Sequence, residues 1–217
     1  MIIVTGGAGF IGSNFILKFL ESSNENLLNL DNLSYAANLS NLKTIDSDPR
    51  YSFSKINIQN QSEVEEIVKE VKPRAILNFA AESHVDRSIE GPESFINTNI
   101  LGTYSLLEAA LNYWNDLDES GKKIFRFFHI STDEVFGSLD INDKKSTEES
   151  SYKPNSPYSA SKAASDHLVR AWHHTFKLPT LVSNCTNNYG PHQHEEKLIP
   201  LIITKALKNE DLPIYGD

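Results

Sequence analysis

A glycine-rich turn near the start of the chain constrains the fold more than any other feature. It follows the apolar run at residues 2–5 and precedes an amphipathic stretch that begins at Ile11, so it joins a predicted strand to a predicted helix. Its glycines, Gly6, Gly9 and Gly12, have a spacing typical of turns that bind dinucleotides. Glycine permits the unusual backbone dihedrals of such a turn and leaves room for a pyrophosphate at the helix N-terminus. The turn therefore predicts the first βα unit of a parallel sheet.

The rest of the chain alternates short apolar runs with longer helix-like patterns. This order predicts an α/β fold with a Rossmann-like, doubly wound parallel sheet. The predicted strands are residues 2–5, 27–31, 51–57, 75–79, 125–130 and 180–184. The predicted helices are residues 11–21, 63–71, 92–114, 157–176 and 197–208. The polar residues 140–155 are expected to form a long loop.

We expect two domains, of which the second is mostly missing. Residues 1–190 are predicted to form the dinucleotide-binding domain, and residues 191–217 the start of a smaller C-terminal lobe that binds substrate. Residues 213–215 are expected to be a strand that has nothing to pair with before the sequence ends at Asp217. The chain is thus expected to be an N-terminal fragment, inactive or weak as an enzyme by itself.

Composition excludes several classes of protein. The net charge of −9 predicts no broad basic surface for nucleic acid or an anionic membrane. No apolar run reaches the length of a membrane span, and we expect no signal peptide. The single cysteine, Cys185, excludes an internal disulfide and fits the reducing cytoplasm. The seven histidines lack the spacing of a zinc site, so no metal is expected, and His129 is expected to lie inside the fold.

An acidic residue ends the second predicted strand. Asp31 follows Gly12 by 19 residues, close to the spacing of about 20 residues expected for an acid that binds the ribose hydroxyls of a dinucleotide. Its carboxylate would repel a 2′-phosphate. We therefore expect the cofactor to be NAD in preference to NADP.

Tyr158 and Lys162 lie four residues apart on one face of a predicted helix. A tyrosine with a pKa of about 10 is a poor base at neutral pH. A nearby ammonium and a positive nicotinamide ring would lower that pKa. The pair is thus predicted to be a general base that takes the proton of an alcohol. Together with the glycine turn, it resembles the short-chain dehydrogenase superfamily.

Two adjacent carboxylates, Asp133 and Glu134, follow another predicted strand. The carboxyl ends of parallel strands share one edge of the sheet, which would bring these residues near the glycine turn and residues 78–83. Adjacent carboxylates titrate as a coupled pair, with one in the acid form and one in the base form. Because oxidation of an alcohol requires no such pair, it indicates a second reaction.

A closer resemblance extends along the whole chain. It is carried by the strings TGGAGFIGSNF, AAESHVDRSI, STDEVFG, PYSASKAASDH, NCTNNYGPHQ and EKLIPL. By these strings the chain resembles the dTDP-glucose 4,6-dehydratases, a family of NAD-dependent enzymes within the extended short-chain dehydrogenases. The resemblance implies that Thr132 contacts the sugar, Asp133 is the acid and Glu134 the base. It also implies that Tyr158 and Lys162 drive hydride transfer.

The same resemblance implies binding residues. Besides the glycines, NAD contacts are implied at Phe10, Ile11, Asp31, Asn32, Ser34, Ile58, Ala80, Ala81, Ser83, Thr98 and Asn188. Contacts with the sugar nucleotide are implied at Ser83, Thr132, Asn187, Lys197, Leu198, Pro213 and Tyr215. The chain departs from the family pattern at Asn57, where an aspartate usually faces the adenine amino group. An amide oxygen can still accept that hydrogen bond.

The implied reaction is a dehydration of dTDP-glucose without net oxidation. C4 is oxidised, water is lost across C5 and C6, and hydride returns to C6, which gives a 4-keto-6-deoxy sugar. A UDP-sugar 4-epimerase or UDP-glucuronate decarboxylase of the same fold remains an alternative, but an epimerase has no need of the carboxylate pair. A non-catalytic NAD-binding protein is a further alternative, although such proteins typically lose the tyrosine or the lysine.

The two predicted helices at residues 92–114 and 157–176 carry more apolar residues than one buried face requires. Examples are Tyr104, Leu107, Leu168 and Trp172. As in the resembling family, we expect a homodimer joined by these two helices from each subunit in a four-helix contact. The alternative is that the missing C-terminal lobe covers these apolar residues.

Overall fold

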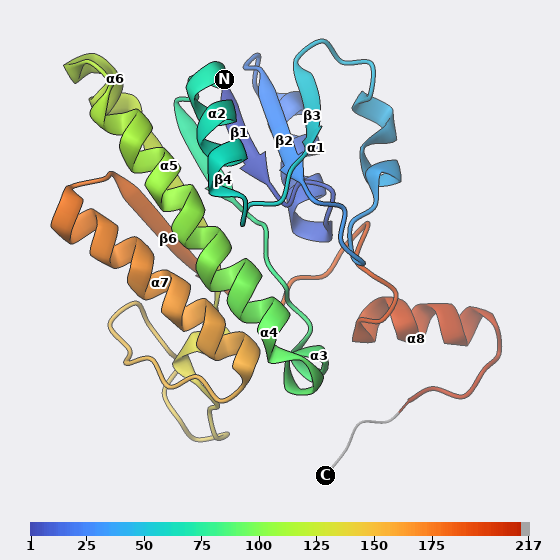
Figure 1. Ribbon diagram of the computed structural model, residues 1–217. Helices are drawn as coiled ribbons and strands as arrows, with labels where there is room; N and C mark the ends of the chain where they lie inside the picture. The colour runs from blue at the N-terminus through green and yellow to red at the C-terminus, as the bar shows by residue number, and fades with distance from the viewer. Residues whose placement is uncertain (214–217) are drawn as a thin grey trace.

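A parallel sheet forms the centre of the structure, a computed structural model that describes residues 1–213. Within these residues the sheet has six strands in the order β3-β2-β1-β4-β5-β6 (Figure 1). The strands are β1 (Ile2–Thr5), β2 (Leu27–Asp31), β3 (Tyr51–Lys55), β4 (Ala75–Asn78), β5 (Arg126–Thr132) and β6 (Thr180–Cys185). The order reverses beside β1, so the sheet is doubly wound, as predicted.

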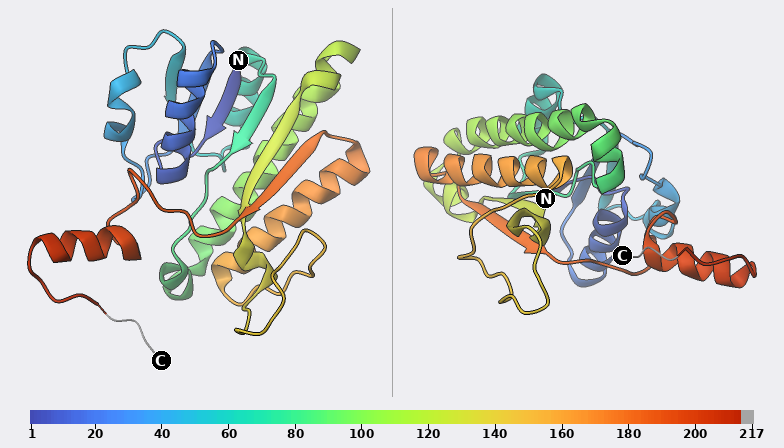
Figure 2. Two further views of the ribbon diagram at one scale, coloured as in Figure 1. Left: turned by 180° about the vertical axis from the view of Figure 1, so that it is seen from behind. Right: turned by 90° about the horizontal axis from the view of Figure 1, so that it is seen from below.

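Helices cover the two faces of the sheet (Figures 1 and 2). One face carries α2 (Gln61–Val71), α5 (Thr103–Asn115) and α7 (Pro157–Phe176). The other carries α1 (Phe10–Ser22) and the 3₁₀ helix η1 (Leu39–Ile45). The shorter elements are α3 (Val85–Glu90), α4 (Pro92–Phe95), the π-helix η2 (Ile96–Gly102), α6 (Glu119–Ile124) and the 3₁₀ helix η3 (Asp133–Phe136).

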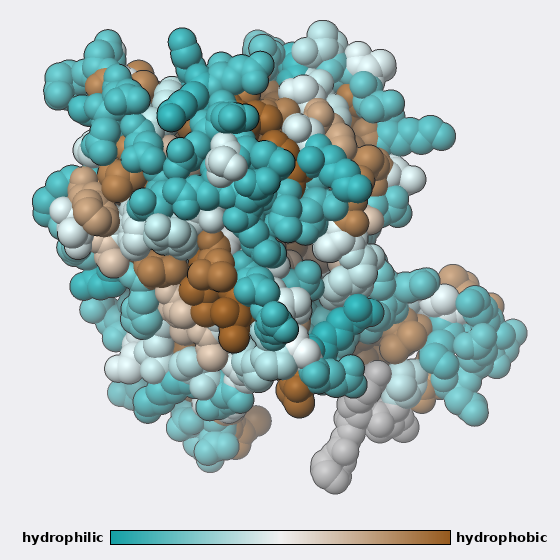
Figure 3. Space-filling model, in the orientation of Figure 1, coloured by the Kyte–Doolittle hydropathy of each residue, from teal (hydrophilic) through white to brown (hydrophobic). Residues whose placement is uncertain are grey.

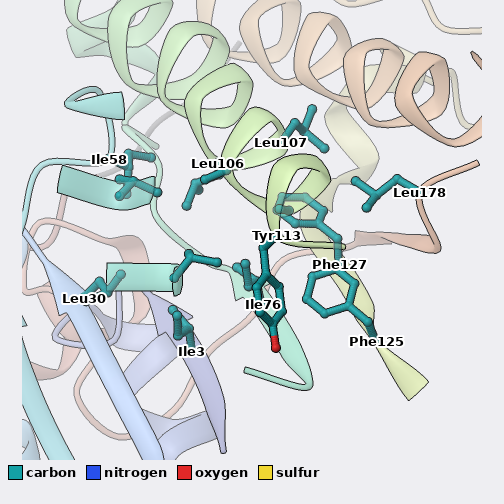
Figure 4. Close-up of a cluster of buried hydrophobic side chains, with 14 of the residues drawn as sticks. Ile3, Leu30, Ile58, Ile76, Leu106, Leu107, Tyr113, Phe125, Phe127 and Leu178 are labelled. Atoms are coloured by element: carbon teal, nitrogen blue, oxygen red, sulfur yellow. The ribbon is translucent and has the colours of Figure 1, made fainter. Parts of the chain in front are cut away.

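The core explains why β1, β2 and β4 are buried along their whole length. Ile3, Ile76 and Phe127 pack toward α5 and α7 (Figure 4), whereas Ile2 and Leu77 pack toward α1. Since both faces are covered, adjacent residues of one strand are buried on opposite sides. Burial of each such side chain stabilises the fold by roughly 1.5–3 kcal/mol.

The predicted fold class is confirmed, and the boundaries differ in informative places. β5 continues through Thr132, so the residues before the carboxylate pair belong to the strand. The helix predicted at residues 92–114 contains the π-helix η2, where the buried Asn99 bonds the backbone of Glu82 and the hydroxyl of Ser161. The short elements η1, α3, α6 and η3 were not predicted. The strand predicted at residues 213–215 lies largely outside the described residues.

The last helix lies apart from the layers. α8 (Leu198–Leu207) contributes no buried residue and extends away from the sheet (Figure 1). The predicted loop at residues 140–155 is confirmed, since it contains no helix or strand. No helix within residues 1–213 is both long and apolar enough to cross a membrane.

Candidate active site

A cavity of about 480 Å³ lies at the carboxyl ends of the strands. Thr132, Glu134, Tyr158 and Lys162 line it. Of the residues implied to bind NAD or the sugar nucleotide, it is also lined by Gly6, Gly9, Phe10, Ile11, Gly12, Asp31, Asn32, Ser34, Ile58, Ala80, Ala81, Ser83, Thr98, Asn187, Asn188, Lys197 and Leu198. The fold thus brings together residues from nearly the whole chain, as the topology predicted.

The backbone packs so closely around the glycine turn that side chains at Gly6 and Gly12 would not fit. Gly6 has a φ of 68°, and a Cβ there would come within 2.6 Å of the Ala80 backbone nitrogen. A Cβ at Gly12 would overlap the carbonyl oxygen of Gly6. α1 begins at Phe10, directly behind the turn, so its N-terminal N–H groups and partial positive charge adjoin the cavity. These features fit the pyrophosphate of a dinucleotide.

Asp31 is buried at the end of β2 and has a structural role in addition to the predicted one. Its Oδ2 accepts a hydrogen bond from the Ala8 N–H at 2.9 Å, and its Oδ1 accepts one from the Leu33 N–H at 2.8 Å. Burial raises the pKa of Asp31, while these two N–H donors oppose the rise. The carboxylate therefore ties the glycine turn to the end of β2 and still lines the cavity.

Lys162 lies on α7, and its amine is buried between the helix and the sheet. The Nζ donates a hydrogen bond to the Ile130 carbonyl at 2.8 Å and lies 3.4 Å from Nε2 of His129. Burial lowers the pKa of Lys162 to about 8, while the Asp166 carboxylate acts against this shift. His129 is fully buried in β5, so its expected interior position is confirmed.

Tyr158 is also buried, and its pKa moves in the direction opposite to the expected one. Burial raises the pKa of Tyr158, and the Glu134 carboxylate raises it further, whereas a hydrogen bond with Thr132 lowers it. Burial is the largest of these effects, because a buried phenolate loses its water. A positive nicotinamide ring would act in the direction that catalysis needs.

The two carboxylates differ in position although they are adjacent in sequence. Both begin the short helix η3, which Thr132 caps by accepting the Glu134 N–H at 3.2 Å. Glu134 lines the cavity, whereas Asp133 does not and accepts the Thr132 hydroxyl at 3.4 Å. Burial and then the Asp133 carboxylate raise the pKa of Glu134, and Lys197 opposes them. The pair therefore has two distinct environments.

The loop at residues 140–155 returns against η3. The Lys153 N–H donates to the Val135 carbonyl at 2.9 Å. Gly137 ends η3 with a φ of 90°, and a Cβ at this position would lie 2.5 Å from the Lys153 carbonyl oxygen. This close approach holds the end of the loop beside the carboxylates.

Two implied binding residues that the structure describes do not reach the cavity. Asn57 is exposed, and its Oδ1 accepts the Gln59 N–H at 3.0 Å within a local turn. Pro213 is described but does not line the cavity. Tyr215 lies outside the described residues.

Several lining residues were not predicted, among them Tyr35, Glu82, His194 and Glu196. The Arg87 guanidinium lies 3.8 Å from the centre of the Tyr35 ring and 3.5 Å from the Glu196 carboxylate. Glu82 and Arg87 both occur in the string AAESHVDRSI, which could have indicated them. Among the described residues, no three His, Cys, Asp or Glu side chains are grouped to hold a metal.

Comparison with known proteins agrees with this geometry. A model of the family described as GDP-mannose 4,6 dehydratase matches residues 3–217. A dTDP-glucose 4,6-dehydratase of Haemophilus influenzae is 54% identical over all of this chain and 64% of its own length. The crystal structure of a dTDP-glucose 4,6-dehydratase from Bacillus anthracis in complex with NAD has a TM-score of 0.88 and 45% identity, over 100% of this chain and 64% of that one.

A more distant structure shares the fold. The UDP-glucose 4-epimerase of Thermotoga maritima has a TM-score of 0.86 at 27% identity, over 100% of this chain and 66% of that one. The present chain spans only part of these proteins, and it covers 64% of the length of the Haemophilus influenzae relative. Since the family model covers nearly every residue, the chain belongs to the GDP-mannose 4,6 dehydratase family.

Proposed function

We propose that the whole protein is an NAD-dependent dTDP-glucose 4,6-dehydratase. The observation that carries this proposal is that Glu134 lines the same cavity as Tyr158, Lys162 and the glycine turn. Tyr158, as the base for the C4 hydroxyl, and Glu134, as the base for the C5 proton, would then face the same substrate. The relatives from Haemophilus influenzae and Bacillus anthracis, which bear this enzyme name, support the choice of sugar nucleotide.

The residues present fit NAD as the cofactor. The glycine turn and the start of α1 would hold the pyrophosphate, and Asp31 would accept hydrogen bonds from the adenosine ribose. When bound, NAD supplies the group that accepts hydride from C4 of the sugar and later returns it to C6. The dehydratase of Bacillus anthracis, which was crystallised in complex with NAD, supports this assignment.

The side chains of the chain would move the protons. Tyr158 removes the proton of the C4 hydroxyl, with the Lys162 ammonium stabilising the phenolate. The resulting 4-ketone acidifies the C5 proton, which Glu134 removes. Asp133, which meets the cavity through its hydrogen bond with Thr132, takes the role that the resemblance implies and protonates the C6 hydroxyl as it leaves as water. Glu134 returns its proton to C5 when C6 is reduced. The product is a 4-keto-6-deoxy sugar nucleotide.

The epimerase alternative shares the fold and the Tyr158–Lys162 pair, but it leaves the carboxylates of η3 without a role. If the protein were non-catalytic, Tyr158 and Lys162 on α7 would have no role. Incubating the whole protein with dTDP-glucose distinguishes these functions. A dehydratase gives a product that has lost one water and carries a C6 methyl group by NMR. A C4 epimer of unchanged mass, or preferential turnover of UDP-glucose or GDP-mannose, would contradict the proposal.

We further infer that residues 1–190 form the NAD-binding domain and that residues 191–217 begin a substrate-binding lobe. The lack of any buried residue in α8 supports this division. The chain by itself should bind NAD with little turnover, because it spans only part of its relatives' length. The free thiol of Cys185 supports a cytoplasmic location.

We also propose a homodimer through α5 and α7. These helices lie side by side, and apolar residues gather on their outer face (Figures 1 and 3). Tyr104 on α5 packs its ring edge-on against Trp172 of α7, with 5.9 Å between the ring centres, and Phe176 remains exposed beside them. A second copy of the same two helices would cover this surface.

A further inference from the structure

A buried carboxylate on α7 has no part in the proposed mechanism. Asp166 lies one helical turn beyond Lys162 and is 3% exposed. Its Oδ2 accepts three hydrogen bonds, from Ser131 Oγ at 2.8 Å, the Tyr152 hydroxyl at 2.9 Å and Asn184 Nδ2 at 3.1 Å. These donors come from β5, the loop before α7 and β6. Burial raises the pKa of Asp166, whereas Lys162 and these three donors oppose the rise and favour the ionised carboxylate.

The second oxygen of Asp166 and the amine of Lys162 both approach one nitrogen of His129. Within residues 1–213, Oδ1 has no hydrogen-bond partner, and it lies 3.4 Å from Nε2 of His129. The same nitrogen lies 3.4 Å from the Nζ of Lys162. Nε2 of His129 is therefore close to both the amine and the carboxylate.

The polar residues around His129 determine which nitrogen carries its proton. Thr5 accepts the Ala80 N–H, so its own hydroxyl donates to Asn78 Oδ1 at 2.7 Å. The Asn78 amide then presents an N–H to Nδ1 of His129 at 3.2 Å. Nδ1 is therefore an acceptor, and the network assigns the proton to Nε2, facing Ser165 and Asp166.

His129 contributes no charge of its own. Full burial, and then the neighbouring Lys162, hold the pKa of His129 well below its usual value. In the neutral form it can donate toward Asp166, but it cannot neutralise either neighbour. The buried amine of Lys162 needs a negative charge from another group if it is to stay protonated.

Among the residues that the structure describes, Asp166 does the most to keep Lys162 charged. Cys185, from β6, donates its thiol hydrogen to the Ser131 carbonyl at 3.2 Å, and it raises the pKa of Lys162 less than Asp166 does. Tyr158 is a phenol whose pKa is raised mainly by burial. On the α5 side, Glu108 accepts a hydrogen bond from Trp172, toward the far end of α7. Glu134, from η3, faces the cavity where the substrate would bind.

We propose that Asp166 is a positioning residue that provides the buried counter-charge of Lys162 and keeps its ammonium protonated beside Tyr158. The same carboxylate holds the strand ends at the site, because Asn184 bonds both Asp166 and the Thr132 carbonyl, at 3.1 and 3.2 Å. The consequence for catalysis rests on the proposed function. The charge pairing itself does not.

A double-mutant cycle in the whole protein tests the pairing without any activity. Asp166→Asn leaves Lys162 without its anion, and Lys162→Met leaves Asp166 without its cation. The double variant removes both charges. Its shift in urea midpoint should therefore be smaller than the sum of the two single shifts. If a single variant does not fold, the double variant should recover folding. Additive shifts, or no recovery, would overturn the pairing.

The pH profile of the first oxidation tests the consequence for Tyr158. Loss of the Asp166 charge lowers the pKa of Lys162, so the amine becomes neutral at a lower pH. In Asp166→Asn, the alkaline fall in the rate of C4 oxidation should move down by about one pH unit or more, which corresponds to a lost interaction of about 1.4 kcal/mol. KM for dTDP-glucose should change much less than kcat.

Tyr152→Phe is the matched control, because it removes one hydrogen bond of the same carboxylate and keeps the charge. It should lower stability but leave the alkaline fall near that of the parent protein. If the alkaline fall moved by the same amount in both variants, or did not move in Asp166→Asn, Asp166 would serve only to anchor the loop. If the parent protein does not oxidise dTDP-glucose, the proposed function fails, and the double-mutant cycle still decides the pairing.

Discussion

The Glu134 carboxylate raises the pKa of the Tyr158 phenol from the wall of the same cavity, and only burial has a larger effect. Two bases so close to each other hinder each other's ionisation, since both carry negative charge in their basic forms. Glu134 is the more acidic group and ionises first. The arrangement suits a reaction in which the two groups act on different carbons in successive steps.

Glu134→Gln should therefore separate the two steps in the whole protein. Oxidation at C4 needs Tyr158 and Lys162, and loss of the Glu134 charge lowers the pKa of Tyr158, so this step should continue. An amide cannot take the C5 proton, so product formation should fall by roughly 10²–10⁴-fold. Reduced cofactor should accumulate and absorb in the near ultraviolet.

Two matched variants complete this test. Asp133→Asn should likewise retain oxidation and lose elimination of water, whereas Tyr158→Phe should give no near-ultraviolet signal. Unchanged turnover of dTDP-glucose in both Glu134→Gln and Asp133→Asn would make the pair structural and favour the epimerase.

The acid limb of the elimination step should respond to Lys197. Glu134 must be ionised to remove the C5 proton, and its pKa lies above the ordinary value because of burial and Asp133. Elimination should therefore slow as the pH falls through that raised pKa. Lys197→Met removes the cation that opposes the rise, so the acid limb of kcat should move to higher pH. If the acid limb of kcat stayed in place or moved to lower pH, the predicted effect of Lys197 on the pKa of Glu134 would be contradicted.

Gly137→Ala should destabilise the end of η3. A Cβ on this glycine, at a φ of 90°, would meet the Lys153 carbonyl, which is backbone and cannot rotate away. We expect a loss of about 1–3 kcal/mol in the free energy of unfolding, measured by urea denaturation. Gly91→Ala is the control, because a Cβ there meets nothing closer than the Arg87 carbonyl at 3.9 Å. Equal losses in the two variants would show that the close approach at Gly137 has no special cost.

Asp31→Asn should reduce the preference for NAD over NADP and should also lower the stability of the fold. The parent protein should bind NADP several-fold or more weakly than NAD, because a carboxylate opposes a phosphate monoester. The asparagine amide can accept only one of the two N–H groups that Asp31 accepts, which should cost about 1–3 kcal/mol of stability. Calorimetric titration of both dinucleotides measures the preference. Parent protein that binds NADP as tightly as NAD would contradict the role of Asp31.

Tyr104→Glu should dissociate the proposed dimer. The charge would lie in the contact between α5 and α7, next to Trp172, where it would lose its water on assembly. Sedimentation at micromolar concentration should show a shift from dimer to monomer. Ile141→Glu is the control, since Ile141 is fully exposed in the loop at residues 140–155 and should leave assembly unchanged. A parent protein that is already monomeric would contradict the four-helix contact.

The parts of the site that could be predicted from the sequence are those that depend on local geometry. The glycine turn requires particular dihedrals, and its residues are consecutive. The spacing of Tyr158 and Lys162 places them on one face of α7 whatever surrounds the helix. β1 is followed by Gly6, β2 ends in Asp31 and β5 ends in Thr132, and these residues meet at one edge because parallel strands share their direction.

The remaining features depended on which distant side chains are buried together. Sequence spacing could not show that Asp31 accepts two backbone N–H groups or that Asn57 faces solvent. Nor could it show that Glu134 lines the cavity while Asp133 does not. The direction of the Tyr158 pKa was wrongly expected for the same reason. The cost of burying a charge is a property of the packed interior, and only the tertiary structure creates that interior.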